Sequence, residues 1–121
     1  MARIDIESNG AAARWEVQLR KGALEFAILL TLLKREHYGF ELATSLITNA
    51  HINVPEGTIY PLLLRLAKDK LIEADLRDGE GGAPRKYYTL TPQGRALLEA
   101  MIPRWKQLSS SVDSLLPGDE K

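Results

Sequence analysis

Residues 55–92 read PEGTIYPLLLRLAKDKLIEADLRDGEGGAPRKYYTLTP, and the spacing of apolar side chains changes within this stretch. The first part has a helical period, with apolar residues three and four positions apart at Ile59, Leu62, Leu63, Leu66 and Ala67. From Ile72 onward apolar and charged residues alternate, as they do in a half-buried strand. The stretch therefore predicts a helix that opens at Pro55, followed by a strand.

A hairpin and a last helix complete this region. Residues 78–84, DGEGGAP, are rich in turn-forming glycine and proline, and residues 85–90 form the returning strand. Tyr87 and Tyr88 point to opposite faces of that strand, so we expect one of them in the core. Thr91 is placed to cap a final helix, with Pro92 in its first turn.

Two further helices are predicted upstream. From Ala11 to about Arg35 only Gly22 disfavours a helix, and residues 23–33 are apolar on nearly every side. Such a helix is buried on more than one side, and in a small chain one side is expected to face a second subunit. After a break at Tyr38-Gly39, a short helix carries a stripe of Leu42, Ala43, Leu46 and Ile47.

Three helices, a hairpin and a helix make a mainly α fold with a small β hairpin. This is the order of a winged helix-turn-helix, with an added C-terminal dimerisation helix. We divide the chain into a mobile N-terminal arm (1–10), a winged-helix domain (11–95), a dimerisation helix (96–116) and a tail (117–121). The dimerisation helix has a heptad seam of Met101, Trp105, Leu108, Val112 and Leu115, and Pro103 is expected to kink it.

Composition limits the possible functions of this chain. Its 121 residues carry 16 basic and 16 acidic side chains, which excludes a polycation that coats nucleic acid by bulk charge. Residues 34–95 hold nine Lys and Arg and eight Asp and Glu. Any DNA binding must therefore use a few local cations, be sensitive to salt and depend on two half-sites.

Several chemistries find no support in the sequence. The chain has no cysteine, and its two histidines, His37 and His51, lie far apart without the spacing of metal ligands. No phosphate loop or dinucleotide fingerprint is present. The N-terminus lacks the apolar core of a secretion signal, and no apolar run reaches the roughly 20 residues of a membrane span. We expect a cytoplasmic protein that is not an enzyme and needs no cofactor or metal.

Four strings in order give a sharper identification. They are LRKGALE at 19–25, YGFEL at 38–42, EGTIYPLL at 56–63 and GAPRKYYTLTPQGR at 82–95. Together they resemble the PadR family of bacterial transcriptional regulators, and the similarity runs from about Trp15 to Leu116. The single C-terminal helix resembles the compact members of that family. The resemblance implies a homodimeric winged-helix repressor on a palindromic DNA operator, with small ligands that release the DNA.

The third helix and the hairpin are the expected DNA contacts. On the helix, the candidate residues are Gly57, Thr58, Tyr60, Pro61, Arg65 and Lys68, and on the wing they are Arg77, Arg85 and Lys86. The alternative is that both are ordinary solvated surfaces, since Asp75, Asp78 and Glu80 lie among the wing cations.

The first and last helices are the expected dimer interface, through Trp15, Phe26, Leu30, Met101, Trp105, Leu108, Val112 and Leu115. The resemblance also implies that Trp105, and with it Trp15, lines a site for a small aromatic effector. The alternative is that Trp105 simply fills the interface.

Three positions depart from the family pattern. Lys70 stands where a glycine commonly ends the reading helix, Leu64 replaces a frequent basic residue, and Pro103 interrupts the dimer helix. The neutral charge leaves two alternatives open, a winged-helix adaptor that binds proteins and a module that sequesters ligands. A salt series of binding to the protein's own upstream DNA separates a DNA-binding regulator from both.

Overall fold

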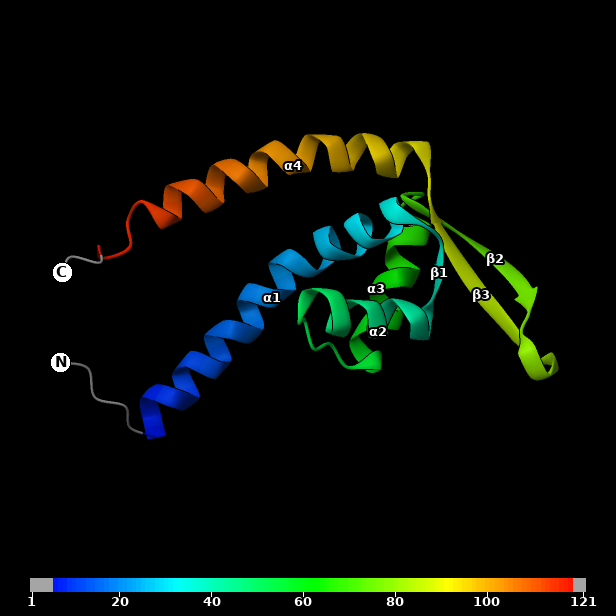
Figure 1. Cartoon of the computed structure of the whole chain (residues 1–121), viewed down its shortest axis with the longest axis horizontal. Coiled ribbons are helices and arrows are strands. Elements are labelled where there is room, and N and C mark those ends of the chain that lie inside the picture. The colour runs from blue at the N-terminus through cyan, green and yellow to red at the C-terminus, as the bar shows by residue number, and fades with distance from the viewer. Residues whose placement is uncertain (1–5, 119–121) are drawn as a thin grey trace.

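The computed structural model describes residues 6–118, which form two long helices, two shorter helices and a small sheet; Figure 1 shows their arrangement. In chain order the elements are α1 (Ile6–Lys34), β1 (His37–Tyr38), α2 (Gly39–Ala50), α3 (Glu56–Lys68), β2 (Ile72–Asp78), a 3-10 turn (Glu80–Gly82), β3 (Pro84–Leu90) and α4 (Pro92–Asp113). The predicted winged helix-turn-helix order with an added C-terminal helix is confirmed.

The sheet contains a strand that the sequence did not reveal. β3 lies in the middle, antiparallel to β2 on one side and to the two-residue β1 on the other. β1 pairs His37 with Tyr88 and Tyr38 with Tyr87, at the position that we interpreted only as a break between helices. A two-residue strand has no period of its own, so it becomes visible only through its partner strand.

One apolar core joins all the helices to the base of the hairpin. Nine side chains in it are almost fully buried: Ile28, Leu29, Leu42, Leu46, Ile59, Leu63, Leu66, Ile72 and Leu98. Tyr88 is buried and Tyr87 is half-buried, so Tyr88 is the tyrosine of the pair that belongs to the core. Ile47, predicted on the core stripe of α2, is 45% exposed, because it lies at the edge of that stripe.

α1 begins earlier than the sequence predicted. Its first described residue is Ile6, so residues 6–10 of the expected arm are helical, while residues 1–5 lie outside the described part of the chain. The helix also continues through Gly22. A Ser-Asn-Gly sequence carries a turn signal that a long helix overrides, since each unfavourable residue costs only about 1 kcal/mol or less.

The ends of α3 explain how Lys70 replaces a glycine. Pro55 is the N-cap, so the helix starts at Glu56, one residue after the predicted opening. At the other end Lys70 has the left-handed φ of 64°, with Lys70 N–H donating to Ala67 O and Leu71 N–H donating to Leu66 O. This is the Schellman arrangement that usually selects glycine. The backbone adopts the glycine conformation although the side chain is lysine.

α4 is one continuous helix through Pro103, and its ribbon bends gently along its length (Figure 1). Thr91 caps it as predicted, with its hydroxyl accepting from Gly94 N–H at 2.9 Å. A side chain at Gly94 would have its Cβ 2.0 Å from Leu71 O, so only glycine fits there. The helix ends at Asp113, earlier than predicted, and Leu115 therefore lies beyond it rather than on the helical seam.

Candidate nucleic-acid interface

The outward face of α3 has a central row of four exposed residues. The row consists of Gly57, Pro61, Leu64 and Lys68. These residues are four, three and four positions apart, so they follow one line along the helix. This line lies opposite Ile59, Leu63 and Leu66, which are fully buried. The middle of the face is therefore uncharged until Lys68, near the end of the helix.

The two flanks of this row are attached to other elements. Tyr60 packs against the start of α2, where a Cβ on Gly39 would lie 2.4 Å from the tyrosine ring. On the other flank Arg65 donates from Nη2 to Glu25 Oε1 of α1 at 2.7 Å. Thr58 is exposed in the first turn of α3. The helix thus presents a narrow outward strip between two anchored side chains.

The first wing cation, Arg77 of β2, is held by carboxylates. It donates to both oxygens of Glu36, at 2.6 and 2.8 Å, and to Asp75 Oδ2 at 3.0 Å. The hydrogen bonds from Arg77 hold the pKa of Glu36 below its ordinary value, and in return they raise the pKa of Arg77. The guanidinium also lies 4.6 Å from the centre of the Tyr87 ring. Arg77 therefore joins the wing to the segment after α1.

Arg85 and Lys86 of β3 reach the neighbourhood of α3. Arg85 lies 4.4 Å from the centre of the Tyr38 ring, and Lys86 is exposed. A hollow of about 470 Å³ lies between the start of α2, the first half of α3 and the wing, lined by Tyr38, Gly39, Phe40, Tyr60, Pro84, Arg85, Lys86 and Tyr88. It brings together three of the predicted DNA contacts, namely Tyr60, Arg85 and Lys86. Burial raises the pKa of Tyr88 at its base.

Sequence reasoning missed the residues that fix these cations. Glu25 and Glu36 hold Arg65 and Arg77 across 40 and 41 positions of the chain, and Gly39 provides the surface on which Tyr60 packs. An ion pair at such a separation leaves no local pattern. The only available signal was that each glutamate interrupts a run of apolar or basic residues.

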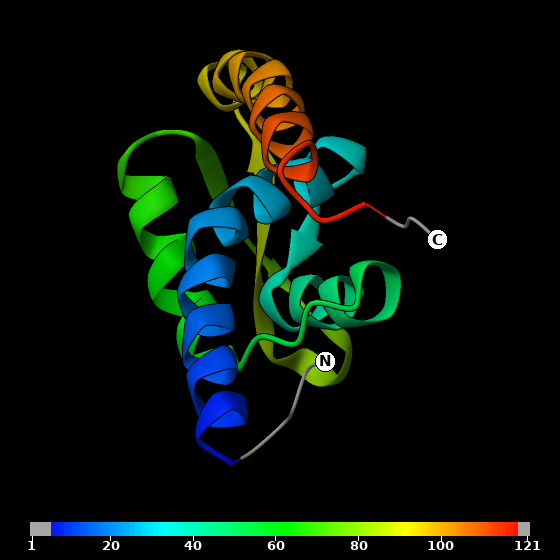
Figure 2. The same cartoon turned by 90° about the vertical axis from the view of Figure 1, so that its left-hand side faces the viewer.

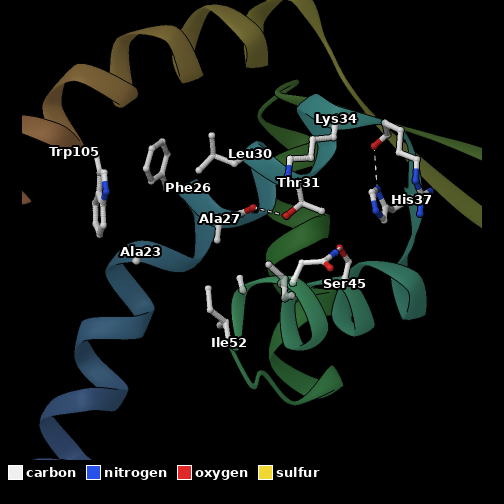
Figure 3. Close-up of a pocket in the computed structure, with 14 residues that line it drawn as sticks. Ala23, Phe26, Ala27, Leu30, Thr31, Lys34, His37, Ser45, Ile52 and Trp105 are labelled. Carbon is white, nitrogen blue, oxygen red and sulfur yellow. Dashed lines mark hydrogen bonds between the residues drawn. The ribbon is translucent and has the colours of Figure 1, made fainter.

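A second hollow, of about 530 Å³, lies between α1, α2 and α4 (Figure 3). Its wall is mainly apolar, with Phe26, Leu30 and Ile52 on it and Trp105 of α4 at one end. Lys34 and His37 lie toward the other end. Of the two tryptophans predicted to line an effector site, Trp105 lines this hollow, whereas Trp15 is 65% exposed on α1 and does not.

The predicted dimer residues fall into two groups. Phe26 is buried in its own chain, 5.6 Å from the ring of Trp105 between centres, and Leu30 and Met101 are half-buried against the core. The others remain exposed: Trp15 on α1, Trp105, Leu108 and Val112 on α4, and Leu115 just beyond the end of α4. Leu19, one turn after Trp15 on α1 and also exposed, adds to this surface. The two helices diverge toward the chain termini, and this leaves their facing sides uncovered (Figures 1 and 2).

The part of the chain that the structure describes contains neither a membrane-spanning helix nor a metal-binding cluster. Within residues 6–118, none of the helices is both long and apolar enough to cross a bilayer. The same residues contain no group of three or more His, Cys, Asp or Glu side chains placed to bind a metal ion.

Comparisons with known proteins agree with this geometry. Residues 28–100 match the model of the transcriptional regulator PadR-like family. A transcriptional regulator from Mycobacterium tuberculosis is 35% identical over 81 residues, which is 67% of this chain and 74% of that protein.

Two solved structures extend the match over nearly the whole chain. A PadR-like transcriptional regulator from Bacillus cereus is 44% identical, with a TM-score of 0.75 over 84% of this chain and 99% of the other. A PadR family regulator from Eggerthella lenta is 29% identical, with a TM-score of 0.83 over 95% of this chain and 100% of the other.

Proposed function

Because this chain belongs to the PadR-like family of transcriptional regulators, we propose that it is a homodimeric, ligand-responsive repressor of a palindromic operator. Family membership identifies a DNA-binding regulator rather than an enzyme. The repressor role, the dimer and the ligand response are the parts that we propose, together with action in the cytoplasm. The observation that carries the proposal is the outward strip of α3, which takes no part in the core and lies beside the wing.

In this proposal α3 enters the major groove, which is wide enough for one helix. At the start of the helix, close approach to the DNA and hydrogen bonds to it come from Gly57, Thr58, Tyr60 and Pro61. At the end of the helix, Lys68 meets a phosphate. Arg85 and Lys86 of the wing meet the flanking backbone.

Arg65 and Arg77 are in a different position, because Glu25 and Glu36 already neutralise them. To contact a phosphate, either arginine must share its guanidinium with that carboxylate or leave the ion pair. We therefore expect these two arginines to hold α3 and the wing in place, and their own contribution to DNA affinity to be small.

A second copy of the chain would cover the open sides of α1 and α4. Trp15, Leu108 and Val112 expose large apolar areas along these two helices. Large apolar surfaces of this kind mark interaction sites in soluble proteins. Two copies would place two α3 helices on one face of the dimer, as a two-fold symmetric operator requires.

The hollow beside Trp105 is the proposed effector site. Its apolar wall and aromatic end suit a flat aromatic molecule, with Lys34 available to a polar substituent. Because α1 and α4 form both this hollow and the proposed dimer surface, a ligand there would change the separation of the two α3 helices. Trp15, which does not line the hollow, is left as a dimer contact.

Binding of the full-length protein to its own upstream DNA tests the proposal. Fluorescence anisotropy across a salt series should show sequence-specific binding that weakens steeply as salt rises. Thr58→Ala and Tyr60→Ala should each weaken it, and Arg65→Ala should weaken it less. If no specific, salt-dependent binding occurs, the protein is an adaptor or a ligand-sequestering module instead. If all three variants bind like wild type, α3 is not the reading helix.

A further inference from the structure

Leu64 is an apolar side chain on the surface that we assign to DNA. It is 68% exposed, more than any other large apolar residue of α3. It lies one turn after Pro61 and one turn before Lys68, in the central row of the outward face. On a face directed at solvent alone, leucine at this position would offer no advantage over a polar residue.

We propose that Leu64, flanked by Pro61, recognises the methyl group of a thymine in each half-site of the operator. This inference rests on the proposed function, because it requires α3 to lie in the major groove. It assigns to Leu64 a role in selecting the base, and it makes Leu64 a source of sequence preference that does not depend on charge.

The chemistry of the groove selects the base. Leucine neither donates nor accepts a hydrogen bond, so it gains nothing from the polar atoms of a base edge. Thymine is the base that presents an apolar group in the major groove, its C5-methyl, whereas cytosine presents an amino group. Covering that methyl removes apolar surface from both partners, and placing leucine over cytosine instead covers an unpaired amino donor.

The surroundings of Leu64 favour such an apolar interaction. Gly57 and Pro61 continue the uncharged row toward the start of the helix, and neither carries a long side chain that would hold the helix away from the bases. Arg65, the nearest cation in the sequence, is drawn to Glu25 of α1 at 2.7 Å. The centre of the reading face is therefore left to apolar contact.

The test needs an operator with defined thymines. The operator is first selected from a randomised DNA duplex library with the full-length protein, and each thymine in it is then replaced in turn by deoxyuridine, which lacks only the methyl. For wild type, replacing one thymine per half-site should lower the affinity about fourfold for each methyl lost, and thus about 16-fold for the two half-sites together. Leu64→Ala should bind more weakly and be indifferent to deoxyuridine at that position.

Two controls show whether the deoxyuridine effect depends on Leu64 and on the methyl group specifically. Leu76→Ala removes a leucine that is 66% exposed in β2, outside α3, and it should keep the wild-type response to deoxyuridine at that position. Replacing the same thymine–adenine pair by 5-methylcytosine–guanine restores the methyl. For wild type this pair should bind better than unmethylated cytosine–guanine, and for Leu64→Ala the two should be equal.

The outcomes separate this inference from the proposed function. If the library yields no sequence that the protein prefers, the proposed function fails. If a specific operator emerges but Leu64→Ala retains the full deoxyuridine effect at every thymine, the role of Leu64 is wrong and the regulator assignment stands. Urea unfolding of the variant should match wild type, which shows that the substitution leaves the core intact.

Discussion

The two faces of α3 have opposite exposures. The inward face carries Leu63, which is 0% exposed, and the adjacent residue on the outward face, Leu64, is 68% exposed. The two leucines are neighbours in the sequence, and only the 100° turn of the helix between them, about 3.6 residues per turn, separates a core position from a surface position. The comparison shows that the fold needs one face and leaves the other available for recognition.

The largest expected effect is on stability and belongs to the inward face. Leu63→Ala should lower the free energy of unfolding by about 2–5 kcal/mol, because it removes buried methyl groups and leaves a cavity. Leu64→Ala should change it by less than about 0.5 kcal/mol, as is usual for surface substitutions. Urea unfolding followed by circular dichroism measures both. Equal changes would mean that the two faces do not differ in the way described.

The next effect is on DNA and belongs to the outward face. Lys68→Gln should reduce the slope of log affinity against log salt by about 0.9 for each phosphate that is no longer neutralised, and thus by about twice that for a dimer. Lys106→Gln, at an exposed position of α4, is the matched control and should keep the wild-type slope. An unchanged slope for Lys68→Gln would remove this lysine from the interface.

A smaller effect is expected where α3 ends. Lys70 adopts a φ of 64°, a conformation that costs a residue with a Cβ roughly 1–2 kcal/mol. Lys70→Gly relieves that cost, and the greater freedom of the unfolded chain offsets part of the gain, so a net gain of about 1 kcal/mol is expected. A higher urea midpoint, with an unchanged dependence of the unfolding free energy on urea concentration, would show this gain in stability. A lower midpoint would mean that the lysine side chain itself stabilises the turn.

The smallest effect concerns the ion pairs that Arg77 of the wing makes with Glu36 and Asp75. The lowered pKa of Glu36 means that this pair contributes stability above the carboxylate's unfolded pKa and that the contribution is lost as pH falls through the folded value. Because Nη1 and Nη2 of Arg77 donate to Glu36, the NMR resonances of these Nη–H groups should shift on acidification, at a pH below the ordinary glutamate pKa of 4.5. Glu36→Gln should remove most of that shift. If the shift persists unchanged in this variant, protonation of Asp75 rather than of Glu36 causes it.

Much of this fold could be predicted because each long element has a period of its own. The spacing of Ile59, Leu63 and Leu66 predicted α3, and the alternation from Ile72 predicted β2. The Thr91 cap predicted the start of α4. The missed elements depend on distant partners. β1 exists only because Tyr87 and Tyr88 pair with it, and the start of α1 was hidden by a local turn signal.

The candidate site was predicted in part for the same reason. Helical period alone put Thr58, Tyr60 and Lys68 on the outward face of α3. It could not show that Glu25 and Glu36 engage Arg65 and Arg77, because those ion pairs join residues 40 and 41 positions apart. A basic residue in a sequence therefore predicted charge, while the fold decided whether that charge was already neutralised.

The absence of cysteine from the chain allows a direct test of where α3 lies. A DNA-cleaving metal chelate can be attached to the single thiol of Lys68→Cys on α3 or of Lys106→Cys on α4, and each protein bound to the selected operator. If the outward face of α3 lies in the groove, the Lys68→Cys conjugate cuts within both half-sites, and the Lys106→Cys conjugate leaves them intact. Equal cutting by both, or none from α3, would contradict the placement of α3 in the groove.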